Sequence, residues 1–92
     1  MKLDRVSMAP PLFSVCIPNY NYAKYLGHTL ESVLSQTCKD FEIIVADNAS
    51  TDRSVDVVES YHDPRIRLIR NKTNIGFAPN LDRATEKALG QF

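Results

Sequence analysis

The 92-residue chain has no excess of charge of either sign. Lysine and arginine together number 11, aspartate and glutamate also number 11, and the formal net charge is zero. A nucleic-acid-binding domain usually has a basic excess or a basic stripe, and this sequence has neither. We therefore expect no nucleic-acid partner. A net charge near zero also favours self-association over solubility.

Cysteine is scarce, and the two that are present form no recognisable motif. Cys16 lies inside an apolar run and Cys38 follows a helical pattern, without a CxxC pair or a Cys/His ligand spacing. We interpret both as buried or half-buried free thiols in a reducing compartment. A structural zinc site is not expected from these residues.

The sequence also lacks a long apolar run. Nothing approaches the ~20 residues of a membrane-spanning helix, and residues 1–12 have no apolar segment of the secretory type. We expect a cytoplasmic location, with the cytoplasmic face of a membrane as an open alternative. The three glycines form neither a G-x-G-x-x-G nor a Walker A loop, so an NAD-type or P-loop site has no support.

What the chain does contain is apolar runs that alternate with helical patterns. An extended lead-in over residues 1–12 precedes a single domain over residues 13–92. The expected strands cover residues 13–17, 41–46 and 66–70, and the expected helices cover about 25–36, 53–61 and 79–89. Pro18 is expected to stop the first strand. Gly76 is the expected positive-φ position before the third helix, and Gly90 the residue that ends that helix.

The element order predicts an α/β, Rossmann-like fold with a parallel sheet. Right-handed crossovers give the strand order 3-2-1, with the first two helices on one face and helices overall on both faces. A fourth strand beside the first is missing or only begun, with Gln91-Phe92 as its first step. The open edge of the first strand could pair with another chain, which predicts a homodimer.

Polar residues follow the first two strands, at the edge where open α/β sheets bind ligands. Asp47 ends the second strand and could accept a hydrogen bond from a nucleobase imide N–H. Its alternative role is a helix cap or turn former. Tyr20 follows the first strand and could stack on the base, an interaction worth ~1–3 kcal/mol. Its alternative is a partly exposed loop tyrosine.

Further nucleotide-binding candidates surround these two. Pro18 and Asn21 would shape the first loop, although Pro18 could also be a plain strand terminator. Asn48 adjoins Asp47 and belongs to the same candidate set. Arg70, Asn71 and Lys72 could lie near the base or the diphosphate, where a positive group suits an anionic donor. Their alternative is a solvated strand end.

The remaining polar residues receive mainly structural interpretations. Gly76 is structural, with a backbone that could approach the nucleotide. Asp52 is interpreted as a helix cap rather than a ligand. Residues 47–52 do not form a calcium loop, because Ala49 offers no side-chain oxygen. His28 and His62 are interpreted as surface residues, and no metal ligand is assigned in this chain.

Four segments of the sequence resemble family 2 glycosyltransferases, in the right order and over nearly all of residues 13–92. They are Phe13-Ser14-Val15-Cys16-Ile17-Pro18-Asn19-Tyr20-Asn21; Tyr25-Leu26, Leu30, Ser32-Val33-Leu34 and Gln36-Thr37; Glu42-Ile43-Ile44-Val45-Ala46-Asp47-Asn48-Ala49-Ser50-Thr51-Asp52; and Asn74-Ile75-Gly76-Phe77-Ala78-Pro79-Asn80. The resemblance implies a GT-A fold that binds a nucleoside diphosphate sugar, a UDP-sugar in the first instance. It gives Asp47 a role toward uracil.

The resemblance also implies an activity. The sugar would pass to a hydroxyl of a carbohydrate or lipid-linked acceptor, with inversion, as in cell-surface polysaccharide biosynthesis. In the full-length enzyme a divalent metal, Mg²⁺ or Mn²⁺, held in part by an Asp-x-Asp motif, would offset charge on the leaving diphosphate. That motif and the catalytic base are expected beyond Phe92. The resemblance therefore implies that residues 13–92 are the N-terminal, nucleotide-sugar-binding part of a longer GT-A transferase. We assign no catalytic residue here and expect the chain alone to be inactive.

Two other functions fit the pattern less fully. A non-catalytic module could bind a nucleotide or a partner through the same half of the fold. A flavodoxin-like or receiver-like signalling domain has the same element order, but it predicts an acidic cluster after the first strand. This sequence has Pro18-Asn19-Tyr20-Asn21 at that point.

Overall fold

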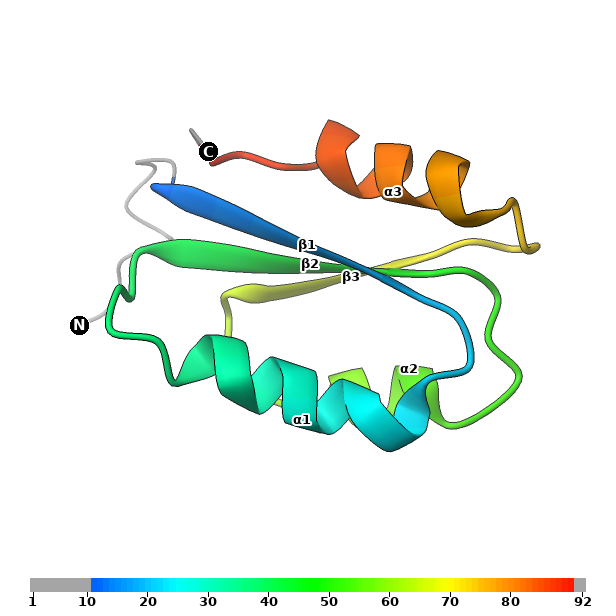
Figure 1. The fold of residues 1–92 in the computed structure, drawn as a ribbon, viewed down its shortest axis with the longest axis horizontal. Helices are drawn as coiled ribbons and strands as arrows, with labels where there is room; N and C mark the ends of the chain where they lie inside the picture. Colours follow the sequence, from blue (N-terminus) through cyan, green and yellow to red (C-terminus); the bar gives the residue numbers. More distant parts are fainter. Residues whose placement is uncertain (1–10, 91–92) are drawn as a thin grey trace.

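The computed structural model describes residues 11–90, in which strands and helices alternate (Figure 1). The elements are β1 Phe13–Asn19, α1 Ala23–Leu34, β2 Phe41–Asp47, α2 Ser54–Glu59, β3 Ile66–Arg70 and α3 Phe77–Glu86. The predicted α/β order is confirmed. Most of the predicted lead-in, and the predicted start of a fourth strand at Gln91-Phe92, lie outside the described residues. Within residues 11–90, no helix has the length and apolar character needed to cross a membrane.

The three strands form one parallel sheet with β2 in the centre. The order is β1-β2-β3, which confirms the predicted order 3-2-1. In the register, Asn19 of β1 and Arg70 of β3 both lie opposite Asp47 of β2. The last residues of all three strands therefore form a row across the carboxyl edge of the sheet.

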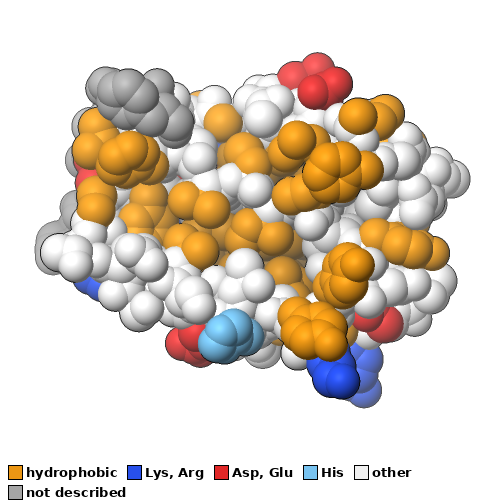
Figure 2. Space-filling view, viewed as in Figure 1, with side chains coloured by type: hydrophobic (Ala, Val, Ile, Leu, Met, Phe, Trp, Pro, Cys, Tyr) orange, Lys and Arg blue, Asp and Glu red, His pale blue; other side chains and the backbone are white. Residues whose placement is uncertain are grey.

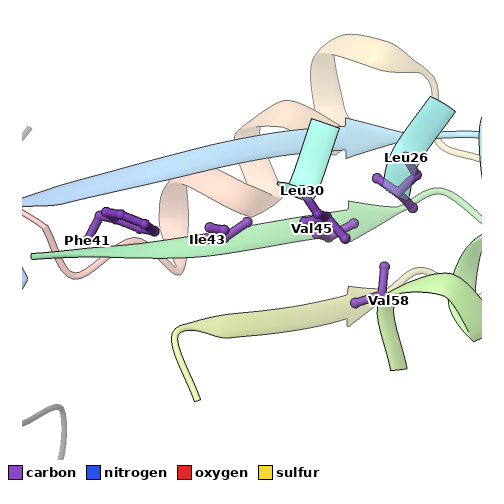
Figure 3. Close-up of a cluster of buried hydrophobic side chains, with 6 residues drawn as sticks. All are labelled: Leu26, Leu30, Phe41, Ile43, Val45 and Val58. Carbon is purple, nitrogen blue, oxygen red and sulfur yellow. The ribbon is translucent and has the colours of Figure 1, made fainter. Parts of the chain in front are cut away.

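The two faces of β2 are covered by different helices, so every residue of this strand is buried. Ile43 and Val45 face α1 and α2, where they pack with Leu26, Leu30 and other apolar side chains (Figure 3). Ile44 and Ala46 face α3 instead. A strand covered on both faces is expected to be apolar almost throughout. Full burial of a Leu or Ile side chain stabilises the fold by about 1.5–3 kcal/mol.

Pro18 does not end β1, which corrects the prediction. The strand continues to Asn19. The Phe13 N–H donates to the Asp40 carbonyl at one end, and the Asn19 carbonyl accepts from the Asn48 N–H at the other. Odd-numbered residues of β1 therefore bond to β2, and the Pro18 nitrogen points to the opposite side. On the edge of a sheet, a missing N–H breaks no ladder bond.

The helix α1 begins and ends two residues earlier than predicted. Its first N–H, on Ala23, donates to the Asp52 carboxylate at 3.0 Å. Satisfying an N–H of the first turn stabilises the start of a helix, and this partner lies 29 residues away in the sequence. Leu26 and Leu30, one turn apart on the same face of this helix, are buried.

The end of α3 also differs from the prediction, because the helix stops at Glu86. Leu89, which the predicted helix over 79–89 included, lies beyond the end of α3 and is 61% exposed, whereas Asn80 within the helix is buried. Beyond the helix, the backbone N–H of Gly90 donates to Ser14 Oγ at 2.7 Å. A Cβ at Gly90 would lie 2.6 Å from that oxygen. The glycine therefore permits a close approach to β1 and does not cap the helix.

The edge strand β1 is less covered than β2. Its residues from Ser14 to Pro18 are only half-buried. Figure 2 shows apolar side chains running across the middle of the face where β1 lies between α1 and α3. Among the described residues, β1 pairs with β2 alone, so the predicted open edge is present.

Candidate functional site

Two separate hydrogen-bond networks occupy the carboxyl edge of the sheet. Asp47 and Asn48 follow one another in the chain, and both are only 3% exposed. Asp47 bonds with Asn19 and Ser50, whereas Asn48 bonds with the loop that precedes α3. Consecutive residues of a strand point to opposite faces. One network therefore lies beside each face at the end of β2.

The Asp47 carboxylate holds the ends of β1 and β2 together. Its Oδ1 accepts from Asn19 Nδ2 at 3.0 Å and from Ser50 Oγ at 2.7 Å. Its Oδ2 accepts from the backbone N–H of Ser50 at 3.0 Å. The alternative interpretation of Asp47 as a turn former describes these contacts well, because Asp side chains commonly bond to the backbone of the following turn.

The loops after β1 and β2 are joined by a second set of contacts. Asn21 has φ 55° and its Oδ1 accepts from the backbone N–H groups of Thr51 and Asp52. Asp52 in turn accepts from Ser54 at the start of α2 and from Ala23 at the start of α1. The hydrogen bond from the Ser54 hydroxyl is the main reason that the pKa of Asp52 is lowered. Asp52 is therefore a link between two helix starts, in keeping with its predicted capping role.

The Asn48 side chain is fixed by four hydrogen bonds. Its Nδ2 donates to the Gly76 carbonyl and to Asn74 Oδ1, and its Oδ1 accepts from the Ile75 N–H and from Asn71 Nδ2. Gly76 has φ 90°, as predicted, and precedes α3. Asn48 thus ties the end of β2 to the loop after β3.

An open cavity of about 560 Å³ lies between the loops that follow β2 and β3. Ala49 and Ser50 line one side, and Arg70, Asn71 and Lys72 line the other. Two cationic side chains therefore flank one wall. Neither Arg70 nor Lys72 takes part in an ion pair among the residues that the structure describes. Their charges remain available to an anion.

The predicted site residues do not all meet at this cavity. Arg70 lines it, and Asp47, Asn48 and Gly76 belong to the networks beneath the loops. Tyr20 is 44% exposed on the loop after β1, and neither it nor Pro18 is among the lining residues.

The exposure of the two histidines and the two cysteines was also predicted from the sequence. His28 and His62 are exposed, as expected of surface residues. Cys16 is half-buried, as predicted, but Cys38 is exposed in the connection between α1 and β2, which corrects the prediction for this residue.

Lys72, expected with Arg70 and Asn71 near the anionic donor, lines the cavity. Ser50 was not among the predicted site residues, yet its hydroxyl donates to Asp47 three residues earlier and it lines the cavity. The spacing Asp-x-x-Ser after an apolar strand could have indicated it.

The described residues contain no group of three His, Cys, Asp or Glu side chains that could hold a metal ion. Near the cavity, the polar atoms come mainly from asparagine, serine and cationic side chains. Such groups suit an anionic ligand better than a divalent cation.

Comparison with known proteins gives consistent matches. The sequence matches the model of glycosyl transferase family 2 over residues 14–92. A PGL/p-HBAD biosynthesis glycosyltransferase of Mycobacterium bovis is 35% identical over 88 residues, which are 92% of this chain and 34% of the relative. The chain spans about a third of the length of such curated relatives.

Solved structures match to a similar degree. S. aureus TarS in complex with UDP-GlcNAc has a TM-score of 0.80 and 32% identity, over 86% of this chain and 24% of TarS. The mannosyltransferase PcManGT from Pyrobaculum calidifontis, in complex with GDP-Man and Mn²⁺, has a TM-score of 0.76 and 28% identity, over 88% of this chain and 25% of PcManGT.

Proposed function

The chain belongs to glycosyltransferase family 2, with the GT-A-like α/β arrangement of TarS, and from that membership we propose that its carboxyl edge binds a nucleoside diphosphate sugar, a UDP-sugar in the first instance. The observation that supports this most directly is the cavity flanked by Arg70 and Lys72, next to the ends of three parallel strands. TarS and PcManGT were solved with UDP-GlcNAc and GDP-Man. Ligands of open α/β sheets bind at this edge.

The proposed roles follow from chemistry and exposure. Arg70 and Lys72 would meet the diphosphate, because guanidinium and ammonium groups form strong charge-assisted bonds with phosphate. Tyr20, half exposed after β1, would stack on the base. The predicted bond from the base imide to Asp47 requires the Ser50 loop to move, since Asp47 is buried and already accepts three hydrogen bonds. Pro18, Asn21, Asn48 and Gly76 would shape the edge.

The reaction proposed for the whole protein is sugar transfer to an acceptor hydroxyl with inversion. The acceptor would be a carbohydrate or a lipid-linked carbohydrate, and the setting cell-surface polysaccharide biosynthesis at the cytoplasmic face of a membrane. Mg²⁺ or Mn²⁺ would offset the diphosphate charge. The residues that hold the metal and remove the proton are proposed to lie beyond residue 92, so the chain alone should bind a donor without turnover.

We predict that exposed residues of the site control the affinity for UDP. Tyr20→Ala should raise the Kd for UDP roughly tenfold, since stacking on a base is worth ~1–3 kcal/mol. Arg70→Ala should raise it roughly tenfold to a hundredfold, because a hydrogen bond to a charged group is worth ~1.5–3 kcal/mol. Isothermal titration calorimetry with UDP, with and without Mn²⁺, measures both.

Two matched variants serve as controls for this titration. Tyr25→Ala removes a tyrosine that is 57% exposed on α1, and Arg53→Ala removes an arginine whose side chain is 84% exposed. Both should leave the Kd within about twofold of the parent value. If the parent chain does not bind UDP, or if the site and control variants behave alike, the proposed nucleotide site is wrong.

A second candidate function is a non-catalytic module that binds a partner, and the half-buried edge strand β1 favours it. Exposed strand edges invite pairing with another chain, and the zero net charge does not oppose it. We predict that the chain forms homodimers as its concentration rises through the micromolar range. Light scattering after size-exclusion chromatography measures this, and a monomer at the highest soluble concentration contradicts it.

A further inference from the structure

Four asparagines form a connected group on the α3 side of the carboxyl edge. Asn48 bonds with Asn71 and Asn74. Asn71 Nδ2 also donates to Asn80 Oδ1 at 2.8 Å, and Asn80 Nδ2 donates to the Ala46 carbonyl at 2.8 Å. Asn48 and Asn80 are 3% and 2% exposed. The group therefore joins β2, the loop after β3 and the first turn of α3.

The group fixes one wall of the cavity from beneath. Asn71 lies between the two cations in the sequence. Its backbone N–H donates to the Asp47 carbonyl at 2.9 Å, and its side chain donates to both Asn48 and Asn80. A residue held through backbone and side chain alike limits the movement of its neighbours. Arg70 and Lys72 are thereby kept on one side of the cavity, opposite Ala49 and Ser50.

Amide side chains suit this role because they are neutral and both donate and accept. An aspartate at position 48 would place a carboxylate oxygen against the Gly76 carbonyl, where Asn48 Nδ2 now donates at 3.2 Å. It would also add a negative charge near Arg70 and Lys72. Neutral amides hold the loop and leave the positive charge of the wall intact.

The arrangement leaves one polar atom unsatisfied. Asn71 Oδ1 is buried and has no hydrogen-bond partner among the described residues. Turning the amide over would place this oxygen against the oxygens of Asn48 and Asn80, so the observed orientation is fixed by its neighbours. A buried acceptor without a partner is rare in proteins and calls for an explanation, and such exceptions concentrate at functional sites.

We propose that Asn48, acting through Asn71 and Asn80, is a positioning residue that sets the distance between the two walls of the cavity and so holds Arg70 and Lys72 ready for an anionic ligand. Asn48 does not contact the ligand in this scheme. The identity of the ligand, the diphosphate of a sugar nucleotide, rests on the proposed function. The mechanical role of the network does not, and it can be measured without ligand.

The first test compares Asn48→Ala with Thr73→Ala, an exposed residue of the same loop. Amide hydrogen exchange by NMR reports on Ile75, whose N–H donates to Asn48 Oδ1 at 2.9 Å. Asn48→Ala should speed exchange at Ile75 at least tenfold while amides in the centre of β2 exchange as before. It should also weaken UDP binding at least fivefold in calorimetry. Thr73→Ala should change neither quantity.

The outcomes separate this proposal from the proposed function. If the parent chain does not bind UDP, the proposed function fails, and exchange at Ile75 still decides whether the network holds the loop. If UDP binds the parent and Asn48→Ala equally well, the positioning role is overturned. Unchanged exchange at Ile75 overturns it as well.

A second variant applies if Asn48→Ala does not fold. Asn48→Asp keeps the acceptor for Ile75 and Asn71 but loses the donor to Gly76 and Asn74. The Gly76 N–H donates to Asn74 Oδ1, which Asn48 Nδ2 now holds in place. Asn48→Asp should therefore speed exchange at Gly76 and weaken UDP binding at least fivefold, with Ile75 still protected. Parent-like exchange and affinity in this variant overturn the proposal.

Discussion

Glu42→Ala is expected to lower the free energy of unfolding by about 3 kcal/mol, although the residue lies far from the candidate site. Glu42 is 2% exposed in the centre strand. Its carboxylate accepts from Arg67 Nη1 and from Ser14 Oγ at 2.7 Å, and from the Leu89 N–H at 2.6 Å. Removing one member of a buried ion pair typically costs ~3–5 kcal/mol. The Arg67 side chain is 38% exposed, so water can solvate it once Glu42 is removed. We therefore expect a loss of stability at the lower end of this range.

Urea unfolding at pH 7 measures this effect. The total stability of a domain this size is ~5–14 kcal/mol, so such a loss shifts the midpoint clearly. Glu59→Ala, an exposed glutamate at the end of α2, is the matched control and should change stability by less than about 0.5 kcal/mol. Equal midpoints for the two variants would show that the Glu42 contacts contribute nothing net.

The effect of Glu42 should also depend on pH. Burial acts to raise the pKa of Glu42, but the hydrogen bonds from Leu89, Ser14 and Arg67 outweigh it and leave the pKa lowered from 4.5. A lowered pKa contributes stability that is complete above the unfolded-state pKa and is lost as the pH falls through the folded-state pKa. The difference between parent and Glu42→Ala should therefore shrink below about pH 4.5.

The sequence allowed the fold to be predicted because the fold depends on local patterns. The near-continuous apolar run of β2 indicated a strand covered on both faces, and the short connections indicated parallel pairing. The end of α3 was predicted wrongly because it depends on contacts that no local pattern contains. Leu89 and Gly90 bond to residues 47 and 76 positions earlier in the chain. Glu42 lies within the apolar run of β2 and was not singled out from the sequence, yet it accepts hydrogen bonds from both Ser14 and the Leu89 N–H.

The candidate site was predictable to a similar extent. Parallel strands must end at the same edge, so the proximity of the polar clusters after β1 and β2 followed from topology alone. The hydrogen-bond partners of the individual residues did not follow from topology. The sequence indicated neither that Asp47 bonds with Asn19 of β1 nor that Asn48 bonds with the loop before α3. That division depends on which face each side chain meets, and an error of one residue in register would exchange the two.

Asp47→Ala is expected to cause the second large loss, about 2–4 kcal/mol of unfolding free energy. The variant removes the acceptor of the Ser50 hydroxyl and of the Ser50 N–H, and it leaves Asn19 Nδ2 with only the long hydrogen bond of 3.4 Å to Ser50 Oγ. Each buried donor left unsatisfied costs ~1–3 kcal/mol, and water that enters beside the half-buried Ser50 recovers part of the total. Asp56→Ala is the matched control, since Asp56 is 63% exposed and its pair with Arg53 contributes little. In urea unfolding, Asp56→Ala should change the free energy of unfolding by no more than about 0.5 kcal/mol.

The same variant decides between the two roles of Asp47 when UDP binding is measured under conditions in which it remains folded. If Asp47 accepts the base imide, the Kd for UDP should rise by more than the roughly tenfold expected for Tyr20→Ala, because an ionised acceptor is lost. If Asp47 only braces the loop of Ser50, the folded variant should bind UDP within a few-fold of the parent. Affinity equal to the parent, together with the large loss of stability, would remove Asp47 from the nucleotide site and leave it as the residue that joins β1 to β2.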